Sequence, residues 1–323
     1  MIDVSAMQTR DPALNASIRI ANENKSFIAG SVFPETVQSK KIFKTWQYDT
    51  SNMRRTLSKK ANTAEADLVD YGGFYTSRTS EPHKLATEWD PADEQDNDDV
   101  VADVEMDASL TLMERLLIDR EVEAATLATT STNYPSDLTA ALTSGTDTWI
   151  DAGGDPRGNA KTARLAVRAR VGITPNAMAL SYTGYEHLRL NPNLQDFLKY
   201  TSGDAIPEEK LKSLLGVQYI FVGSALYNTN MEGNATQTLT EIWNDSALFF
   251  VYDPTPRRRV VCYGRGYYRN QLYKYRSEDP KRGSGDGRIQ RLEQGWNYIQ
   301  CAGAVVSSSD PDFAAGYLLR NIF

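Results

Sequence analysis

The sequence predicts an α+β fold for a chain of 323 residues, and three observations support this prediction. A sustained helical period runs through residues 107–129, helix and strand patterns alternate between residues 157 and 250, and strand-like segments dominate after Ala247. A chain of this length buries about three quarters of the surface that it exposes when unfolded. It is therefore long enough to fold alone.

Composition excludes several classes of protein. The 42 acidic and 35 basic residues give a net charge of -7 and a pI near 5.1, so the chain as a whole is not a cationic nucleic-acid binder. The longest apolar run, at 247–252, is far shorter than the roughly 20 residues that span a bilayer, and the N-terminus lacks a signal-peptide pattern. We therefore expect no membrane contact, and the two cysteines favour a reducing cytosol.

The charges are segregated into blocks. Residues 38–60 contain seven bases and one acid, whereas residues 88–107 contain ten acids and no base. A third block, at 257–291, holds eleven bases and three acids. Apart from the acidic block the chain is close to neutral, so any strong electrostatic recognition must be local.

The N-terminal part predicts structure that depends on other copies of the chain. About 45 residues without a helical period, apolar only around 27–34, predict an extended arm. A period-two pattern from Trp46 and a second candidate strand at 74–78 then predict a long, polar, hairpin-like excursion. An isolated hairpin is at best marginally stable in water. We therefore expect a neighbouring subunit to support it.

The best helical pattern lies at 107–129, where apolar residues recur at three- and four-residue steps and Thr111 and Glu114 have capping-box spacing. A second helix is expected to start near Asn159 and to end at Gly172. Further expected elements are a strand at 177–180, a helix at 185–200 broken near residues 191–192, a helix at 207–215 and a strand at 217–222. The C-terminal part predicts strands at 247–252, 260–263, 272–276, 289–292 and 296–301.

Chemical motifs are scarce. The sequence contains no phosphate-binding loop, metalloprotease, hydrolase-elbow or CxxC motif, and its two histidines leave little room for acid–base chemistry. The glycine-rich stretch 283–287 is interpreted as a hairpin loop, and the acidic stretch 96–99 as a solvated surface because the glycine and glutamate of an EF-hand are missing. We therefore predict no catalytic residue, no cofactor site and no metal site.

Two basic patterns leave alternatives open. Between residues 263 and 276 tyrosines alternate with basic residues, which is typical of a half-buried strand and also of a single-stranded nucleic-acid platform. Along the second helix four bases lie opposite the apolar stripe, as on an ordinary exposed face, although they could also bind phosphate or a neighbour's acids: Arg157, Lys161, Arg164 and Arg168.

Five segments, in this order and at these separations, carry a resemblance: FIAGSVFP at 27–34, NAMALS at 176–181, YEHL at 185–188, VGSALYNT at 222–229 and IWNDSAL at 242–248. Together they resemble the major capsid proteins of tailed bacteriophages, the Hong Kong 97-type capsid fold family. The resemblance spans nearly the whole chain. It implies a shell subunit made of the following parts: an N-terminal arm at 1–45, an extended loop at 46–88, a peripheral domain at 89–156 with a spine helix at about 107–129, an axial domain at 157–250, and a return to peripheral-domain strands at 251–323.

The resemblance also implies a function and partners. The chain would be a structural protein and not an enzyme, assembling as hexamers and pentamers into an icosahedral shell around double-stranded DNA. Expected partners are other copies of the chain, a separate scaffolding protein, a portal, possibly a decoration protein, and DNA held by weak non-specific contacts. The expected location is the virion, after assembly in the cytoplasm of a bacterial host.

The charge blocks suggest where subunits meet. Bases in the extended loop and acids just after it have complementary signs, so we expect them to dock across an interface: Arg54, Arg55, Lys59 and Lys60 against Asp93, Asp96, Asp98 and Asp99. Exposed pairs are worth about 0 to 1 kcal/mol each, so charge would set register while apolar contacts supply affinity.

Three other functions remain open at this point. A bacterial encapsulin-like nanocompartment shell would use the same physical design with a protein cargo. A nucleic-acid-binding protein would use the basic region 257–291 and would bind in a salt-sensitive way. An enzyme would place its site in the axial α/β layer, where the sequence shows neither nucleophile nor cofactor motif.

Overall fold

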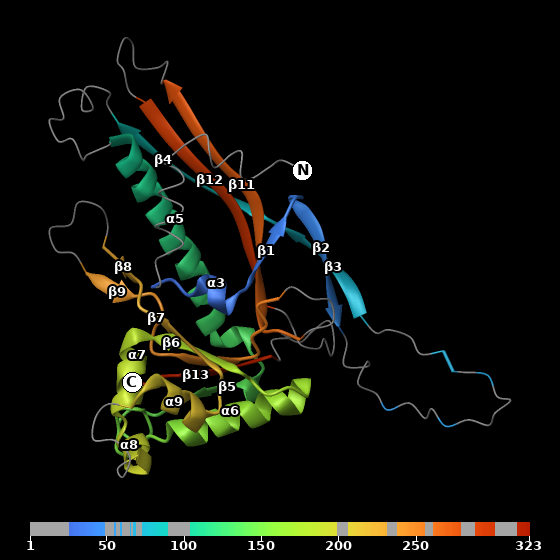
Figure 1. The fold of residues 1–323 in the computed structure, drawn as a ribbon, viewed down its shortest axis with the longest axis vertical. Coiled ribbons are helices and arrows are strands. Elements are labelled where there is room, and N and C mark those ends of the chain that lie inside the picture. The colour runs from blue at the N-terminus through green and yellow to red at the C-terminus, as the bar shows by residue number, and fades with distance from the viewer. Residues whose placement is uncertain are drawn as a thin grey trace.

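The structure is a computed structural model that describes residues 26–48, 55, 59, 65, 67, 68, 73–89, 104–198, 206–230, 238–255, 261–278, 288–300 and 315–323. Figure 1 shows two regions, a long sheet with one long helix beside it and a compact α/β region at the opposite end. Helix α5 (Val104–Thr129) extends from one region to the other. The mixed α+β architecture predicted from the sequence is confirmed.

The long sheet has the strand order β1-β11-β12-β4, made of β1 (Glu35–Gln38), β11 (Gly264–Glu278), β12 (Arg288–Gln300) and β4 (Glu81–Trp89). β11, β12 and β4 are antiparallel neighbours, whereas β1 runs parallel to β11. The register of β11 and β12 shifts between Arg269 and Tyr273, as at a β-bulge. The short strands predicted at 272–276, 289–292 and 296–301 are therefore parts of two long strands, and the strand predicted at 260–263 is wrong because residues 261–263 precede β11 without strand structure.

Helix α5 belongs to two cores, and its side chains show why. In its N-terminal half Leu112, Met113 and Leu116 are buried against Tyr268 of the long sheet. In its C-terminal half Ala124, Ala125 and Ala128 are almost fully buried in the main core, where small side chains let the helix approach its neighbours closely. The long helix predicted at 107–129 is confirmed.

The compact region is built on a five-stranded sheet of order β5-β13-β10-β6-β7. Its strands are β5 (Thr139–Ala141), β13 (Gly316–Arg320), β10 (Ala247–Phe250), β6 (Ala177–Ser181) and β7 (Tyr219–Gly223), and beside them β8 (Leu226–Asn228) pairs with β9 (Leu239–Glu241). Its helices are α6 (Pro156–Val171), α7 (Tyr182–Leu190), α8 (Pro192–Leu198), α9 (Glu208–Leu215) and the single 3-10 turns η2 (Ser131–Asn133) and η3 (Ser136–Leu138). None of the helices in the described residues is both long enough and apolar enough to span a bilayer.

Capping residues and glycine mark the ends of these helices. α6 starts at a proline preceded by Asp155, whose carboxylate accepts the Gly158 N–H at 2.9 Å, and it ends at Gly172 with φ of 76°. The break predicted near residues 191–192 separates α7 from α8. Ala163, Val167 and Val171 of α6 are buried as predicted.

Two expectations are corrected by the tertiary contacts. The terminal strands were expected to complete the peripheral sheet; β11 and β12 do lie in the long sheet, but β13 pairs with β10 and β5 in the compact region. Residues 1–45 were expected to form an extended arm, but Ile28, Val32 and Phe33 are buried in the subunit's own core around the short helix α3 (Ala29–Val32). The reason is that residues 27–34 are mostly apolar, and burying apolar side chains in the core is more favourable in free energy than exposing them to water. Residues 1–25 lie outside the described residues.

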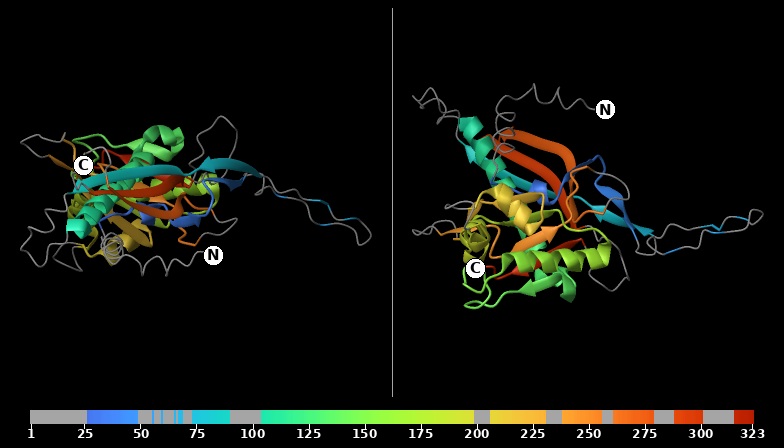
Figure 2. Two further views of the ribbon diagram at one scale, coloured as in Figure 1. Left: turned by 90° about the horizontal axis from the view of Figure 1, so that it is seen from above. Right: turned by 60° about the horizontal axis from the view of Figure 1, so that its bottom comes forward.

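The hairpin-like excursion is present as a two-stranded projection. β2 (Ile42–Tyr48) pairs antiparallel with β3 (Gly73–Thr79), and both views of Figure 2 show these strands extending away from the rest of the molecule. β4 follows directly and belongs to the long sheet, so the paired part of the projection ends at Thr79, earlier than the boundary of 88 expected for the extended loop. The boundaries of the larger parts remain predictions.

Candidate assembly site

The projection β2–β3 has a buried base and exposed walls. At its base Phe43 is buried, and its ring lies 4.8 Å from the ring of Tyr267 in β11. Beyond that contact Ile42 is 64% exposed and Tyr75 is 60% exposed. Large apolar side chains at this exposure on a two-stranded sheet are typical of a surface that is covered by a partner.

The charged residues predicted for docking are mostly outside the described residues. Arg55 and Lys59 are described, and both are exposed. Arg54, Lys60 and the four acids Asp93, Asp96, Asp98 and Asp99 lie outside that part of the chain. Pairing of the basic with the acidic block across an interface therefore stays a prediction.

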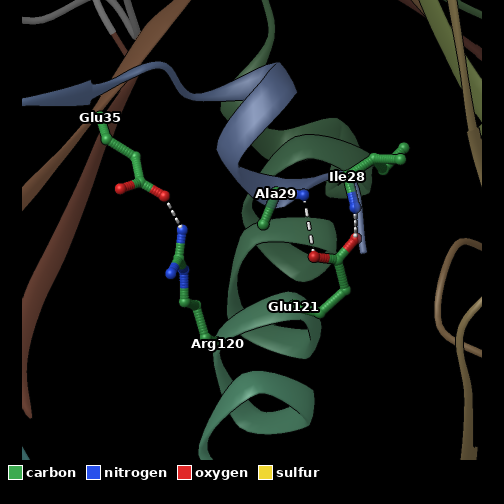
Figure 3. Close-up of polar contacts among 5 residues, drawn as sticks. All are labelled: Ile28, Ala29, Glu35, Arg120 and Glu121. Carbon is green, nitrogen blue, oxygen red and sulfur yellow. Dashed lines mark hydrogen bonds and ion pairs between the residues drawn. The ribbon is translucent and has the colours of Figure 1, made fainter. Parts of the chain in front are cut away.

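The segment that leads into the projection is anchored on α5 by a buried carboxylate. Glu121 is 1% exposed, and its Oε1 accepts the Ile28 backbone N–H at 2.8 Å while its Oε2 accepts the Ala29 N–H at 2.8 Å. The indole Nε1 of Trp243 donates to Oε1 at 2.7 Å. Figure 3 shows the carboxylate pointing at the start of α3.

Arg120, the preceding residue of α5, makes a second attachment. Its Nη2 donates to Glu35 Oε1 of β1 at 2.5 Å, and its guanidinium carbon lies 4.3 Å from the centre of the Tyr268 ring. Figure 3 shows that Arg120 and Glu121 reach residues on either side of α3. Two neighbouring side chains of the helix thus hold the chain just before and just after α3.

Burial controls the ionisation of Glu121. Desolvation raises the pKa of this carboxyl above its usual value, and the hydrogen bonds from Trp243, Ile28 and Ala29 together with the charge of Arg120 oppose that rise. A second buried polar contact lies nearby, where the Tyr134 hydroxyl meets the Tyr263 hydroxyl at 2.5 Å and donates to the Ala128 carbonyl at 2.5 Å. Burial raises the pKa of Tyr134 well above its usual value, so this hydroxyl keeps its proton.

Sequence reasoning missed Glu121 and Arg120, although one signal was present. Position 121 lies four residues after Leu117 and three before Ala124, which places an acid within the apolar stripe of the long helix. A charged residue on a buried helix face requires partners in the fold. Its partners here are backbone groups nearly a hundred residues away, which no local pattern identifies.

The basic face of α6 borders an open groove of about 950 Å³. Arg157, Lys161 and Arg164 line it together with Asp155 and Asp196, so bases and acids are mixed along its walls. Among the residues that the structure describes, no group of histidine, cysteine, aspartate and glutamate is arranged to hold a metal ion.

The aromatic and basic strip is largely buried where its side chains are described, at residues 263–268. Tyr263 and Tyr268 are buried, and Arg265 is 6% exposed with its Nη2 donating to the Thr255 carbonyl at 3.0 Å. Bases could stack only on rings that face solvent. This arrangement favours the strand interpretation of the pattern.

Comparison with known proteins finds a phage capsid protein to which the chain is similar. It is 25% identical over 257 residues to the major capsid protein of Burkholderia phage BcepMu, which covers 79% of this chain and 80% of that protein. No family model matches the sequence.

Solved structures share the fold over almost the whole chain. A phage-related protein from Bordetella bronchiseptica RB50 superposes with a TM-score of 0.69 at 20% identity, over 97% of both chains. A virus-like particle from Pyrococcus furiosus gives 0.55 at 11% identity, over 96% of this chain and 98% of that one. The capsid of Cyanophage P-SCSP1u gives 0.52 at 14% identity, over 91% and 88%. The resemblance stated from the sequence is confirmed: the chain has the Hong Kong 97-type capsid fold and is similar to the major capsid protein of a phage.

Proposed function

We propose that this chain is a major capsid protein, a structural subunit whose copies assemble into the shell of a tailed-phage head. The observation that carries the proposal is its sequence similarity to a phage major capsid protein over about four fifths of both chains. The projection supports it, because Ile42 and Tyr75 lie exposed on a two-stranded sheet, and an isolated pair of strands is at best marginally stable in water. The subunit would act through its geometry and would catalyse no reaction.

In this proposal the shell is icosahedral, is built from hexamers and pentamers, and encloses double-stranded DNA. A separate scaffolding protein, a portal and possibly a decoration protein would take part in assembly in the bacterial cytoplasm, before the subunit resides in the virion. The net charge of -7 agrees with a container whose wall should not bind its DNA strongly.

Electron microscopy of the purified full chain, alone and after co-expression with a scaffolding protein, tests the proposal. Closed shells of uniform diameter are the expected result. A chain that remains a monomer or dimer under all conditions would contradict it.

A nanocompartment shell is the second candidate, and the fold shared with the Pyrococcus furiosus virus-like particle favours it. The content of particles purified from the natural source separates the two functions. Nuclease-protected DNA of uniform length supports a phage head, whereas a single enriched protein cargo supports a nanocompartment.

The basic block of the extended loop offers a direct test of how subunits dock. We expect joint replacement of Arg54, Arg55, Lys59 and Lys60 by alanine to lower particle yield or to produce misshapen particles. The control exchanges arginine and lysine at the same four positions, which keeps the charge. The defect should resemble the effect of high salt on the unmodified protein, because about 1 M salt shortens the screening length to roughly 3 Å. Unchanged yield and shape in the alanine variant would contradict the docking.

A further inference from the structure

The chain that leads into the projection is held at two points on α5. Glu121 accepts three N–H groups at 2.7 to 2.8 Å, two from the start of α3 and one from Trp243. Arg120 binds Glu35 at the start of β1. Figure 3 shows the contacts between the N-terminal segment and the long helix, and the bond from Trp243 adds the loop before β10, which is distant in sequence from both.

If residue 121 served packing alone, a buried carboxylate would be unfavourable in free energy. An apolar side chain of similar size at a buried position is often neutral or stabilising relative to an ionised group. A carboxylate adds directional hydrogen bonds. Two oxygens that accept three donors fix the position of α3 in a way that apolar contacts do not. The arrangement therefore indicates a positioning role.

Only a few residues and the short strand β1 separate α3 from the projection, so the position of α3 affects the projection. β1 begins two residues after Phe33, and three residues separate Gln38 at the end of β1 from Ile42 at the start of β2. The Ser80 N–H donates to the Lys41 carbonyl at 2.8 Å, so the base of the projection is also tied to the turn between β3 and β4. A displacement of residues 28–35 would therefore change the angle at which β2 and β3 leave the subunit.

We propose that Glu121 and Arg120 form a two-point clamp that sets the direction of the β2–β3 projection, and thereby the curvature of the shell that the subunits build. The effect on the shell rests on the proposed function, whereas the clamp itself is a property of the single subunit. Among the described residues, Arg120 is the charged group that acts on Glu121. The segment 26–34 carries no ionisable side chain.

The variant Glu121→Gln tests the first point of the clamp. Its amide oxygen can replace Oε1 and accept from Ile28 and Trp243, but its amide nitrogen is a donor and would face the Ala29 N–H. The matched control is Glu114→Gln, which neutralises an exposed glutamate of the same helix. The variant Glu35→Gln, at a side chain that is 51% exposed, tests the second point without altering a buried group.

Hydrogen exchange of the unassembled full chain measures the clamp directly. We expect the amides of residues 28–33 to lose protection by about tenfold or more in Glu121→Gln, as the loss of one buried hydrogen bond implies, and to be unchanged in Glu114→Gln. Shells of Glu121→Gln and Glu35→Gln should show a broader range of diameters, or a loss of closed particles, while circular dichroism of the subunits matches the unmodified chain.

The outcomes separate the clamp from the proposed function. Unchanged protection in Glu121→Gln would overturn the clamp. Lost protection in a variant whose shells keep the original diameter and yield would overturn its effect on the curvature of the shell. If Glu121→Gln does not fold, Glu35→Gln decides the question, because shells identical to the original would then overturn the proposal. If the unmodified chain forms no shells at all, the proposed function fails, while the exchange experiment still decides whether the clamp exists.

Discussion

At the scale of single residues, two buried polar contacts connect parts of the chain that are distant in sequence. Glu121 connects α5 to α3 and to Trp243, and Tyr134 connects the end of α5 to Tyr263 just before β11. Buried polar groups of this kind stabilise a fold only while every partner is present, because a buried donor or acceptor without a partner costs about 1 to 3 kcal/mol. Their removal should therefore be measurable in the unassembled subunit.

The raised pKa of Glu121 predicts a pH dependence with a defined sign. A folded-state pKa above the unfolded value means that the folded chain binds the proton more tightly, so this stabilising contribution is complete below the usual glutamate pKa. It is lost as the pH rises through the raised pKa. The free energy of unfolding of the unmodified chain minus that of Glu121→Gln should thus fall from acid toward neutral pH and then stay constant. Urea titrations at several pH values test this, and a difference that grows with pH would contradict it.

The tyrosine pair predicts coupled effects. Tyr134→Phe removes the donor to the Ala128 carbonyl and the contact with the Tyr263 hydroxyl, so we expect a loss of about 1 to 2 kcal/mol in the free energy of unfolding. Tyr134→Phe and Tyr263→Phe together should cost less than the sum of the single changes, by about 0.5 kcal/mol or more, since they share one hydrogen bond. Additive losses in chemical denaturation would show that the hydroxyl contact contributes nothing.

At the scale of elements, close backbone approach decides how β7 packs against the loop that carries Trp243. A Cβ atom at Gly223, the last residue of β7, would lie 2.3 Å from Cδ1 of the Trp243 ring, and that ring is 1% exposed. The ring cannot move away without breaking its bond to Glu121. Glycine at this position thus allows the strand, the loop and the helix to meet.

Gly223→Ala should therefore be strongly destabilising. We expect it to lower the free energy of unfolding by about 1 to 3 kcal/mol from overpacking, and to increase hydrogen exchange around residues 28–33. The control is Gly145→Ala, where φ of 78° costs about 1 kcal/mol but no atom lies within 4 Å of the new Cβ. Equal losses in the two variants would show that the Trp243 contact is tolerant of a methyl group.

At the scale of the whole molecule, different parts of the subunit serve folding and assembly. Its two cores involve the long sheet, α5 and the compact region, whereas the projection contributes the buried side chain Phe43 at its base. Stability should thus depend little on the projection beyond that base. Assembly should depend on it strongly.

Replacement of residues 49–72 by a short glycine–serine linker tests this separation. We expect the melting temperature to stay within a few degrees of the original value, because the linker leaves β2, β3 and Phe43 in place. Closed shells should be lost. The control places the same linker at residues 231–237, between β8 and β9. A shortened chain that still forms normal shells would show that this part of the projection is dispensable.

Local sequence patterns were sufficient to predict the long helix, the end of α6 and the paired strands of the projection. The long helix followed from apolar residues at three- and four-residue steps, and the end of α6 followed from Gly172. The paired strands of the projection followed from the alternation around Trp46 and residues 74–78. The same reasoning divided β11 and β12 into shorter strands, because a polar stretch within a long strand resembles a connection when its partner strand is not known.

The sequence by itself determined the fold class, the long helix, the projection and the similarity to phage capsid proteins, since all of these depend on residues close together or on an ordered series of segments. Only the tertiary structure decided that residues 27–34 belong to the subunit's own core, that β13 joins the compact sheet, and that Glu121 holds α3. The physical reason is that burial and hydrogen bonding depend on which distant segments meet. The sequence around a glutamate on a helix does not indicate which two amides and which indole it will bind in the folded chain.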